Sequence, residues 1–158
     1  MIAVGDVIAE RDVHLTRDAL RAYAEASGDH NPIHQDDEVA ASVGLPGVIA
    51  HGMLTMGLAV QPVVDWVAAL RPAPSGSLSE RSESKGPRIT GYGVRFTRMV
   101  VVDAETGADV HITATVGALD AEAGTARIDL TVTAAGETVL GKAQVTVSGL
   151  ALDTPEAG

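Results

Sequence analysis

The sequence predicts an α+β fold in which a curved antiparallel sheet wraps around one long buried helix. Residues 51–70 are apolar on nearly every side, which is typical of a helix buried in a protein core. The C-terminal half instead alternates apolar and polar residues with a period of two, as expected for strands with one covered face. One apolar helix followed by several such strands favours a sheet packed over that helix.

The N-terminal part predicts a strand and two helices. Residues 7–15 are typical of a short strand, and Thr16 is a good N-cap for a helix over 17–27. A shorter helix is expected over 36–42, because acidic residues at its start would lie at the positive end of the helix dipole.

The long helix should begin at His51 and run to about Leu70. Pro62 is expected to kink it or to end its first segment, because proline lacks the N–H that an interior helical position donates. Its polar residues and proline make it unlike a membrane span.

Four strands are expected after this helix. The first covers 89–99, and turns at 120–124 and 135–137 make the other three an antiparallel meander. Their alternating residues are Val110, Ile112, Ala114 and Val116; Ala126, Ile128, Leu130 and Val132; and Val139, Gly141, Ala143, Val145 and Val147.

Length and composition favour one domain over residues 1–158. Residues 73–85 are rich in serine and charge and have little to bury, so they predict a disordered surface insertion. The net charge of −10 argues against nucleic acid or an anionic membrane as a partner. The absence of cysteine excludes disulfides, a thiol nucleophile and zinc–thiolate sites. Residues 1–10 show no signal-peptide pattern, so we expect a cytoplasmic protein.

The strongest candidate for chemistry is the loop from Gly28 to His34. Pro32 excludes regular helix there, and Asn31 before it is biased towards extended geometry. Asp29 and His34 therefore lie five residues apart on a stiff turn. A carboxylate and an imidazole held in this way suit proton transfer. A plain hydrogen-bonded turn is the alternative interpretation of the same residues.

The sequence around this loop resembles the hydratase-2 signature of MaoC-like proteins. Within that family it is most similar to the catalytic subunit of actinobacterial 3-hydroxyacyl-carrier-protein dehydratases. The motif is specific, and the resemblance covers nearly all of the chain outside residues 71–88. The matching segments are 23–34 with 36 and 40, 43–46, 49–56 and 92–97.

This resemblance implies the hotdog fold and a lyase that hydrates 2-enoyl thioesters or dehydrates (3R)-3-hydroxyacyl thioesters, in fatty-acid or polyketide-type metabolism. Asp29 and His34 would exchange a proton with water or with the 3-hydroxyl group. The backbone N–H of Gly52, at the positive start of the long helix, would hold the thioester oxygen. Val60 departs from the pattern, because some relatives carry a serine there.

Other residues are expected to support the site. Asn31 would brace the loop, and His51 would orient the adjacent turn from the helix start, although it could also be a ligand or base. Arg95, with Arg88 and Arg98, could bind the phosphates of CoA or pantetheine. Ordinary solvated strand charges are the alternative for these three arginines.

The remaining histidines are expected to be bystanders. His30 occupies a variable position of the motif, while His14 and His111 fall in strand-like alternation. The histidines and acids show no metal-ligand spacing, so no metal is expected. No phosphate-binding glycine loop is present, so no nucleotide cofactor is expected.

Two other functions stay open at this stage. A hotdog thioesterase would share the fold and the acyl-thioester substrates, and a non-catalytic acyl-binding partner subunit would share the assembly. Intact Asp29 and His34 favour the active enzyme. A homodimer is expected first and a heterodimer with a homologous subunit next, because a long edge strand over 89–99 favours pairing. Acyl length, the choice of CoA or acyl-carrier protein, pathway and direction are left open.

Overall fold

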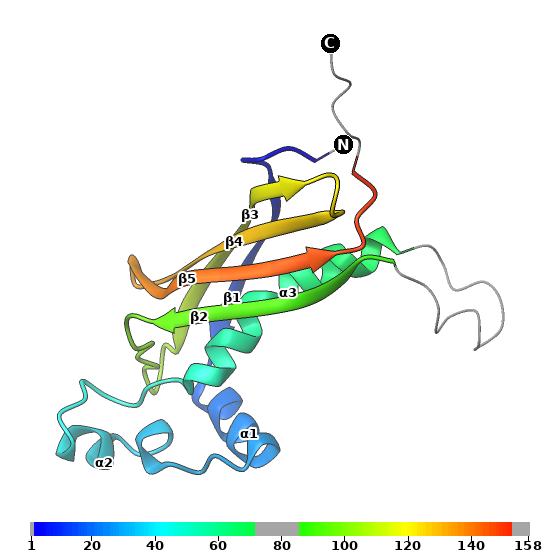
Figure 1. Ribbon diagram of the computed structural model, residues 1–158. Coiled ribbons are helices and arrows are strands. Elements are labelled where there is room, and N and C mark those ends of the chain that lie inside the picture. The colour runs from blue at the N-terminus through cyan, green and yellow to red at the C-terminus, as the bar shows by residue number, and fades with distance from the viewer. Residues whose placement is uncertain (1, 72–85, 153–158) are drawn as a thin grey trace.

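The computed structural model describes residues 2–71 and 86–152, so the predicted insertion at 73–85 lies outside the described residues. It has a five-stranded antiparallel sheet with strand order β1-β3-β4-β5-β2, and a long helix lies across one face of that sheet (Figure 1). The α+β prediction is confirmed. The elements are β1 (Val7–Leu15), α1 (Arg17–Ser27), η1 (Pro32–His34), α2 (Asp37–Ser42), α3 (Gly52–Leu70), β2 (Arg88–Phe96), β3 (Ala108–Asp120), β4 (Thr125–Ala134) and β5 (Glu137–Ser148).

Local signals in the sequence explain the N-terminal elements. The Thr16 hydroxyl caps α1 by accepting an N–H at 3.2 Å, and Gly28 ends this helix in the left-handed conformation with φ 77°. Leu20 and Ala24 are buried on one side of α1. The Asp36 carboxylate caps α2 by accepting two backbone N–H groups. These helix boundaries agree with the prediction to within a residue.

The meander of β3, β4 and β5 is confirmed. Its first two strands bury the predicted alternating residues. Ala135 and Gly136 connect β4 to β5 with φ angles of 50° and 76°, the left-handed pair that a tight two-residue hairpin needs.

The predicted alternation in β5 is wrong at one point. Val139 and Leu140 are both buried, and Gly141 is only partly buried. Lys142 has a φ of 45°, and the pairing with β4 shifts register twice in this region, so the alternation is interrupted here and resumes at Ala143. The strand predicted over 89–99 also ends early, at Phe96.

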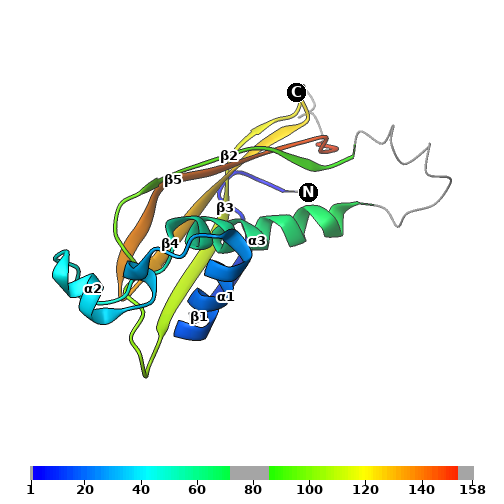
Figure 2. The same cartoon turned by 90° about the horizontal axis from the view of Figure 1, so that it is seen from below.

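The helix α3 runs without interruption through Pro62, so the prediction that this proline ends a segment is wrong. Proline removes one helical hydrogen bond, while its buried ring gains packing against the core. Burial against the sheet offsets the lost bond. Figure 2 shows the sheet arching over α3, with α1 and α2 near the N-terminal end of this helix.

Only one face of α3 is buried, which corrects the prediction of a fully buried helix. Met53 and Val64 on other faces are 61% and 38% exposed. By length and composition α3 could cross a membrane, but core helices of soluble proteins pass the same test. The buried residues that pack it onto the sheet are Thr55, Ala59, Pro62, Val63 and Val67.

Candidate active site

A chain of short-range hydrogen bonds holds the loop that carries Asp29. The Asp29 carboxylate accepts the Asn31 N–H at 3.2 Å. The Asn31 side-chain oxygen accepts the Ile33 N–H at 3.2 Å and so caps η1, where Pro32 occupies the first turn. Asn31 thus lies where a bracing residue was predicted, although His34 belongs to a short 3₁₀ helix and not to an open turn.

His34 is held by a hydrogen bond to the backbone. Its ring is 8% exposed, and its Nδ1 lies 2.7 Å from the Ile49 carbonyl oxygen. A carbonyl only accepts hydrogen bonds, so Nδ1 carries a proton, and no described residue is hydrogen-bonded to Nε2. The Ile49 N–H in turn donates to the Ile33 carbonyl, which ties this support back to η1.

His51 links the loop to α3. It is 1% exposed and precedes the first residue of α3, and its Nε2–H donates to the Asp29 carbonyl oxygen at 3.0 Å. The His51 ring stacks on the His34 ring with centroids 3.9 Å apart. The centroid of the tilted Tyr23 ring lies 4.8 Å from the centroid of His51. This is the predicted position at the helix start. The contacts let His51 fix both the Asp29 backbone and the His34 ring.

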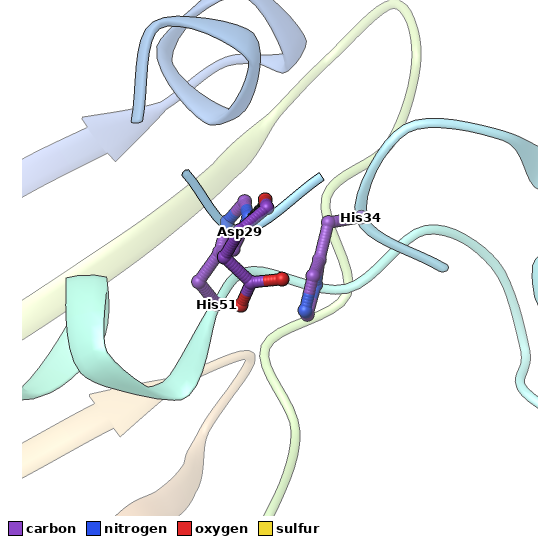
Figure 3. A group of neighbouring side chains, drawn as sticks. All are labelled: Asp29, His34 and His51. Atoms are coloured by element: carbon purple, nitrogen blue, oxygen red, sulfur yellow. Dashed lines mark hydrogen bonds between the residues drawn. The ribbon is translucent and has the colours of Figure 1, made fainter. Parts of the chain in front are cut away.

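Figure 3 shows Asp29, His34 and His51 gathered from the loop, from η1 and from the start of α3. One potential ligand atom from each residue lies within 4.8 Å of the other two, which the sequence spacing did not indicate. The two imidazole planes are only 26° apart, so their in-plane lone pairs do not converge on one ion. The arrangement therefore suits proton transfer better than chelation.

Gly52 supplies an unused donor. It is the first residue of the 19-residue helix α3, and no described residue accepts a hydrogen bond from its N–H. The helix dipole makes this end positive and favours developing negative charge. A Cβ at Gly52 would lie 3.1 Å from the ring of Phe96, so glycine lets this aromatic side chain approach the helix start.

A cleft of about 550 Å³ brings His34 and Gly52 together, and Asp29 and His51 are not among its described lining residues. His34, Gly52 and Thr55 contribute to one side, and the chain that follows β2 contributes to the other. The lining residues are His34, Pro46, Ile49, Ala50, Gly52, Thr55, Phe96, Thr97, Arg98, Met99, Val100, Val101, Glu137 and Leu140. Sequence spacing did not identify Thr55 or Glu137 as part of the site, because strand order brings their segments together, whereas Arg98 was one of the three predicted phosphate-binding arginines.

A larger cavity of about 790 Å³ lies near the other end of α3. Trp66, Leu70 and Leu119 are among its lining residues, and Asp120 is its only titratable group among the described residues. It contains no histidine that could complete an acid–base pair. Its described lining therefore offers no acid–base pair like that of Asp29 and His34.

The other predicted residues lie apart from this cleft. Arg95 is exposed on the edge strand β2 and does not line the cleft, whereas Arg98 does. His30 is exposed near Glu25. His14 and His111 are exposed and donate to Asp109 and Asp12 across the β1–β3 ladder, at 2.6 and 2.5 Å, so they are satisfied surface residues as predicted.

Residues 3–134 match the protein family described as "MaoC like domain". The chain belongs to the MaoC-like family. A solved "MaoC-like dehydratase" is 34% identical, with a TM-score of 0.78 over 93% of this chain and 40% of that chain. The hotdog fold expected from the sequence is thereby confirmed.

Two further relatives of this MaoC-like chain matter for function and assembly. The "3-hydroxyacyl-thioester dehydratase X" of Mycobacterium tuberculosis is 32% identical over 95 residues, which cover 60% of this chain and 27% of that protein. A chain of the ChsH1–ChsH2 complex from Mycobacterium tuberculosis shares the fold at 19% identity, with a TM-score of 0.72 over 94% of this chain and 99% of that chain. The match to the dehydratase thus spans about a quarter of its length.

Proposed function

We propose that this protein catalyses the reversible hydration of 2-enoyl thioesters to (3R)-3-hydroxyacyl thioesters. The observation that carries the proposal is that a carboxylate oxygen of Asp29 lies within 4.8 Å of a ring nitrogen of His34, while His34 lines the same cleft as Gly52 at the start of α3. The relative named 3-hydroxyacyl-thioester dehydratase X supports the same reaction.

In the hydration direction, a water molecule held between Asp29 and His34 adds its oxygen to C3 of the enoyl thioester. One of these two groups accepts a proton from that water, and a proton is delivered to C2 on the same face. The net change is the addition of H and OH across the double bond, and dehydration reverses each step. Because both groups contact one water, either can serve as acid or base, and we assign no order to them.

The negative charge that develops on the thioester oxygen needs a hydrogen-bond donor. The Gly52 N–H meets this need, because it points from the positive end of α3 and has no competing acceptor among the described residues. Partly exposed side chains of Phe96, Met99 and Val101 make the opposite wall of the cleft apolar.

A direct assay tests this function. Purified protein should convert crotonyl-CoA and longer 2-enoyl-CoA thioesters with loss of the enoyl absorbance and without release of free thiol. Stoichiometric thiol release would instead assign the protein to the hotdog thioesterases. Absence of both reactions, with and without a homologous partner subunit, would contradict an enzymatic role.

We also propose that the active form is a dimer, with a homodimer as the first candidate. The strand β2 is an edge of the sheet, and α3 leaves the apolar side chains of Met53 and Val64 exposed. A second hotdog chain would cover both features. The ChsH1–ChsH2 complex shows that a relative with this fold assembles from two kinds of subunit. A cytoplasmic location stays a prediction.

A further inference from the structure

We propose that Arg98 binds a phosphate group of the thioester's carrier and that Glu137 pairs with Arg98 in the free protein. The proposal rests on the acyl-thioester activity proposed above. Both natural carriers of acyl thioesters, CoA and the phosphopantetheine arm of acyl-carrier protein, bear phosphate. The shared ligand chemistry is therefore a phosphate at the far end of the arm that enters the cleft.

The position of Arg98 in the cleft supports this role. Arg98 lines the same cleft as His34 and Gly52, and it is the only lysine or arginine among the described lining residues. Its side chain is 62% exposed, so the guanidinium lies at the mouth of the cleft and not in its interior. A carrier that leaves the site towards solvent would pass this group.

The backbone around Arg98 is fixed against β5. The N–H groups of Thr97 and Arg98 lie 3.1 and 3.5 Å from the Val139 carbonyl oxygen. The Thr97 hydroxyl donates to the Thr138 carbonyl oxygen at 2.9 Å. These contacts hold Arg98 beside Glu137, the first residue of β5, at one rim of the cleft.

The ion pair between Arg98 and Glu137 is weak enough for a phosphate to replace Glu137. The nearest nitrogen–oxygen distance is 3.7 Å, and the two side chains are 62% and 60% exposed. An exposed ion pair of this kind contributes little, whereas a phosphate accepts two parallel hydrogen bonds from a guanidinium. A phosphate that reaches the rim would therefore displace Glu137.

The negative net charge of the chain disfavours the approach of an anionic carrier, so a local positive charge helps the carrier to bind. The chain carries a formal net charge of −10 and repels an anionic carrier at long range. A local arginine at the rim offsets this repulsion where the carrier docks. Of the three arginines that the sequence associated with phosphate, Arg88, Arg95 and Arg98, the structure places only Arg98 in the described lining of the cleft.

The test compares three thioesters with the same crotonyl group: crotonyl-pantetheine without phosphate, crotonyl-4′-phosphopantetheine with one, and crotonyl-CoA. We expect Arg98→Ala to raise KM about tenfold for phosphate-bearing substrates, as loss of a charge-assisted hydrogen bond does. KM for crotonyl-pantetheine and kcat for all three should change little. Arg98→Lys should recover part of the affinity, and Arg71→Ala, which removes a positive charge at the other end of α3, is the control.

Glu137→Gln supplies the opposite test. Removing the competing carboxylate should lower KM for the phosphate-bearing substrates about two- to threefold, the size of an exposed ion pair. Glu122→Gln makes the same charge change in the turn between β3 and β4, away from the cleft, and should have a smaller effect. Both KM changes should shrink as salt is raised.

The substrates affected by Arg98→Ala show which phosphate Arg98 binds. An Arg98→Ala effect on both phosphate-bearing substrates assigns the phosphate common to CoA and acyl-carrier protein, and an effect on crotonyl-CoA alone assigns a phosphate found only in CoA. An equal effect on crotonyl-pantetheine, no effect on any substrate, or a phosphate-dependent effect of Arg95→Ala in its place overturns the proposal. If the wild type hydrates none of the three, the proposed function fails instead.

Discussion

At the scale of single residues, the proposed reaction requires Asp29 and His34 to act on the substrate. We expect Asp29→Asn and His34→Ala each to lower kcat at least about a hundredfold, because general acid–base groups contribute about 10²–10⁴-fold. His30→Ala is the matched control, since this exposed imidazole belongs to the same loop and lies outside the group of Asp29, His34 and His51. Near-normal turnover by either folded variant would contradict the assignment.

Gly52 permits a test of a single backbone N–H. Proline is well tolerated as the first residue of a helix, and the preceding residue His51 has φ −58° and ψ 131°, a conformation compatible with a following proline. Gly52→Pro removes the N–H, whereas Gly52→Ala keeps it. Both add a Cβ that crowds Phe96.

We therefore expect Gly52→Pro to have a kcat about a hundredfold below that of Gly52→Ala, as the loss of one oxyanion donor does. Steady-state kinetics of the two variants, with melting temperatures to confirm folding, measure the difference. An equal loss in both variants would attribute the effect to the crowded Phe96 ring and exclude the N–H.

The structure of the candidate-site loop over residues 28–34 could be predicted because its residues are contiguous. Pro32 and Gly28 restrict the backbone locally, so the structure of the loop follows from short-range chemistry. The stacking of His51 on His34, and the approach of Phe96 to Gly52, depend on packing between distant segments. Periodicity and spacing contain no signal for such contacts.

At the scale of secondary-structure elements, caps and turns explain which predictions succeeded. Thr16, Asp36 and the Ala135–Gly136 turn act within a few residues, so their elements were predicted closely. The continuity of α3 through Pro62 and the bulge near Lys142 are set by packing on the sheet. Tertiary contacts override local propensity at both points.

The elements behind the site are joined by Asp37. Its carboxylate accepts hydrogen bonds from the Arg17 guanidinium at 2.8 Å and the Val48 N–H at 3.3 Å. Arg17 also donates to the Val102 carbonyl oxygen. The Arg17 hydrogen bond, and then that from Val48, hold the pKa of Asp37 below its ordinary value of 3.8.

This pKa shift predicts the direction of a pH effect. A carboxylate with a depressed folded-state pKa stabilises the protein above its ordinary pKa, and this stabilisation is lost as pH falls through the folded value. Thermal melts of wild type and Asp37→Asn should therefore differ most at neutral pH and converge in acid, below the ordinary carboxyl pKa of 3.8. A difference that persists unchanged into acid would exclude ionised Asp37 as the source.

At the scale of the whole molecule, the exposed face of α3 predicts association. Val64→Glu places a charge on that face and should shift the dimer towards monomer in light-scattering measurements, because burying an unpaired charge is costly. Val4→Glu is the control, since this exposed valine precedes β1 and belongs to neither α3 nor the edge strand β2. A wild-type monomer with full activity would contradict the proposed assembly.

The central claim is that the site adds water to an enoyl thioester and leaves the thioester intact. The most direct measurement is chiral analysis of the product formed from crotonyl-CoA by the purified protein, alone and with a homologous partner subunit. We expect (3R)-3-hydroxybutyryl-CoA, formed at a rate that falls at least about a hundredfold in Asp29→Asn. A predominant (3S) product, or free CoA in place of the hydroxyacyl thioester, would contradict the account.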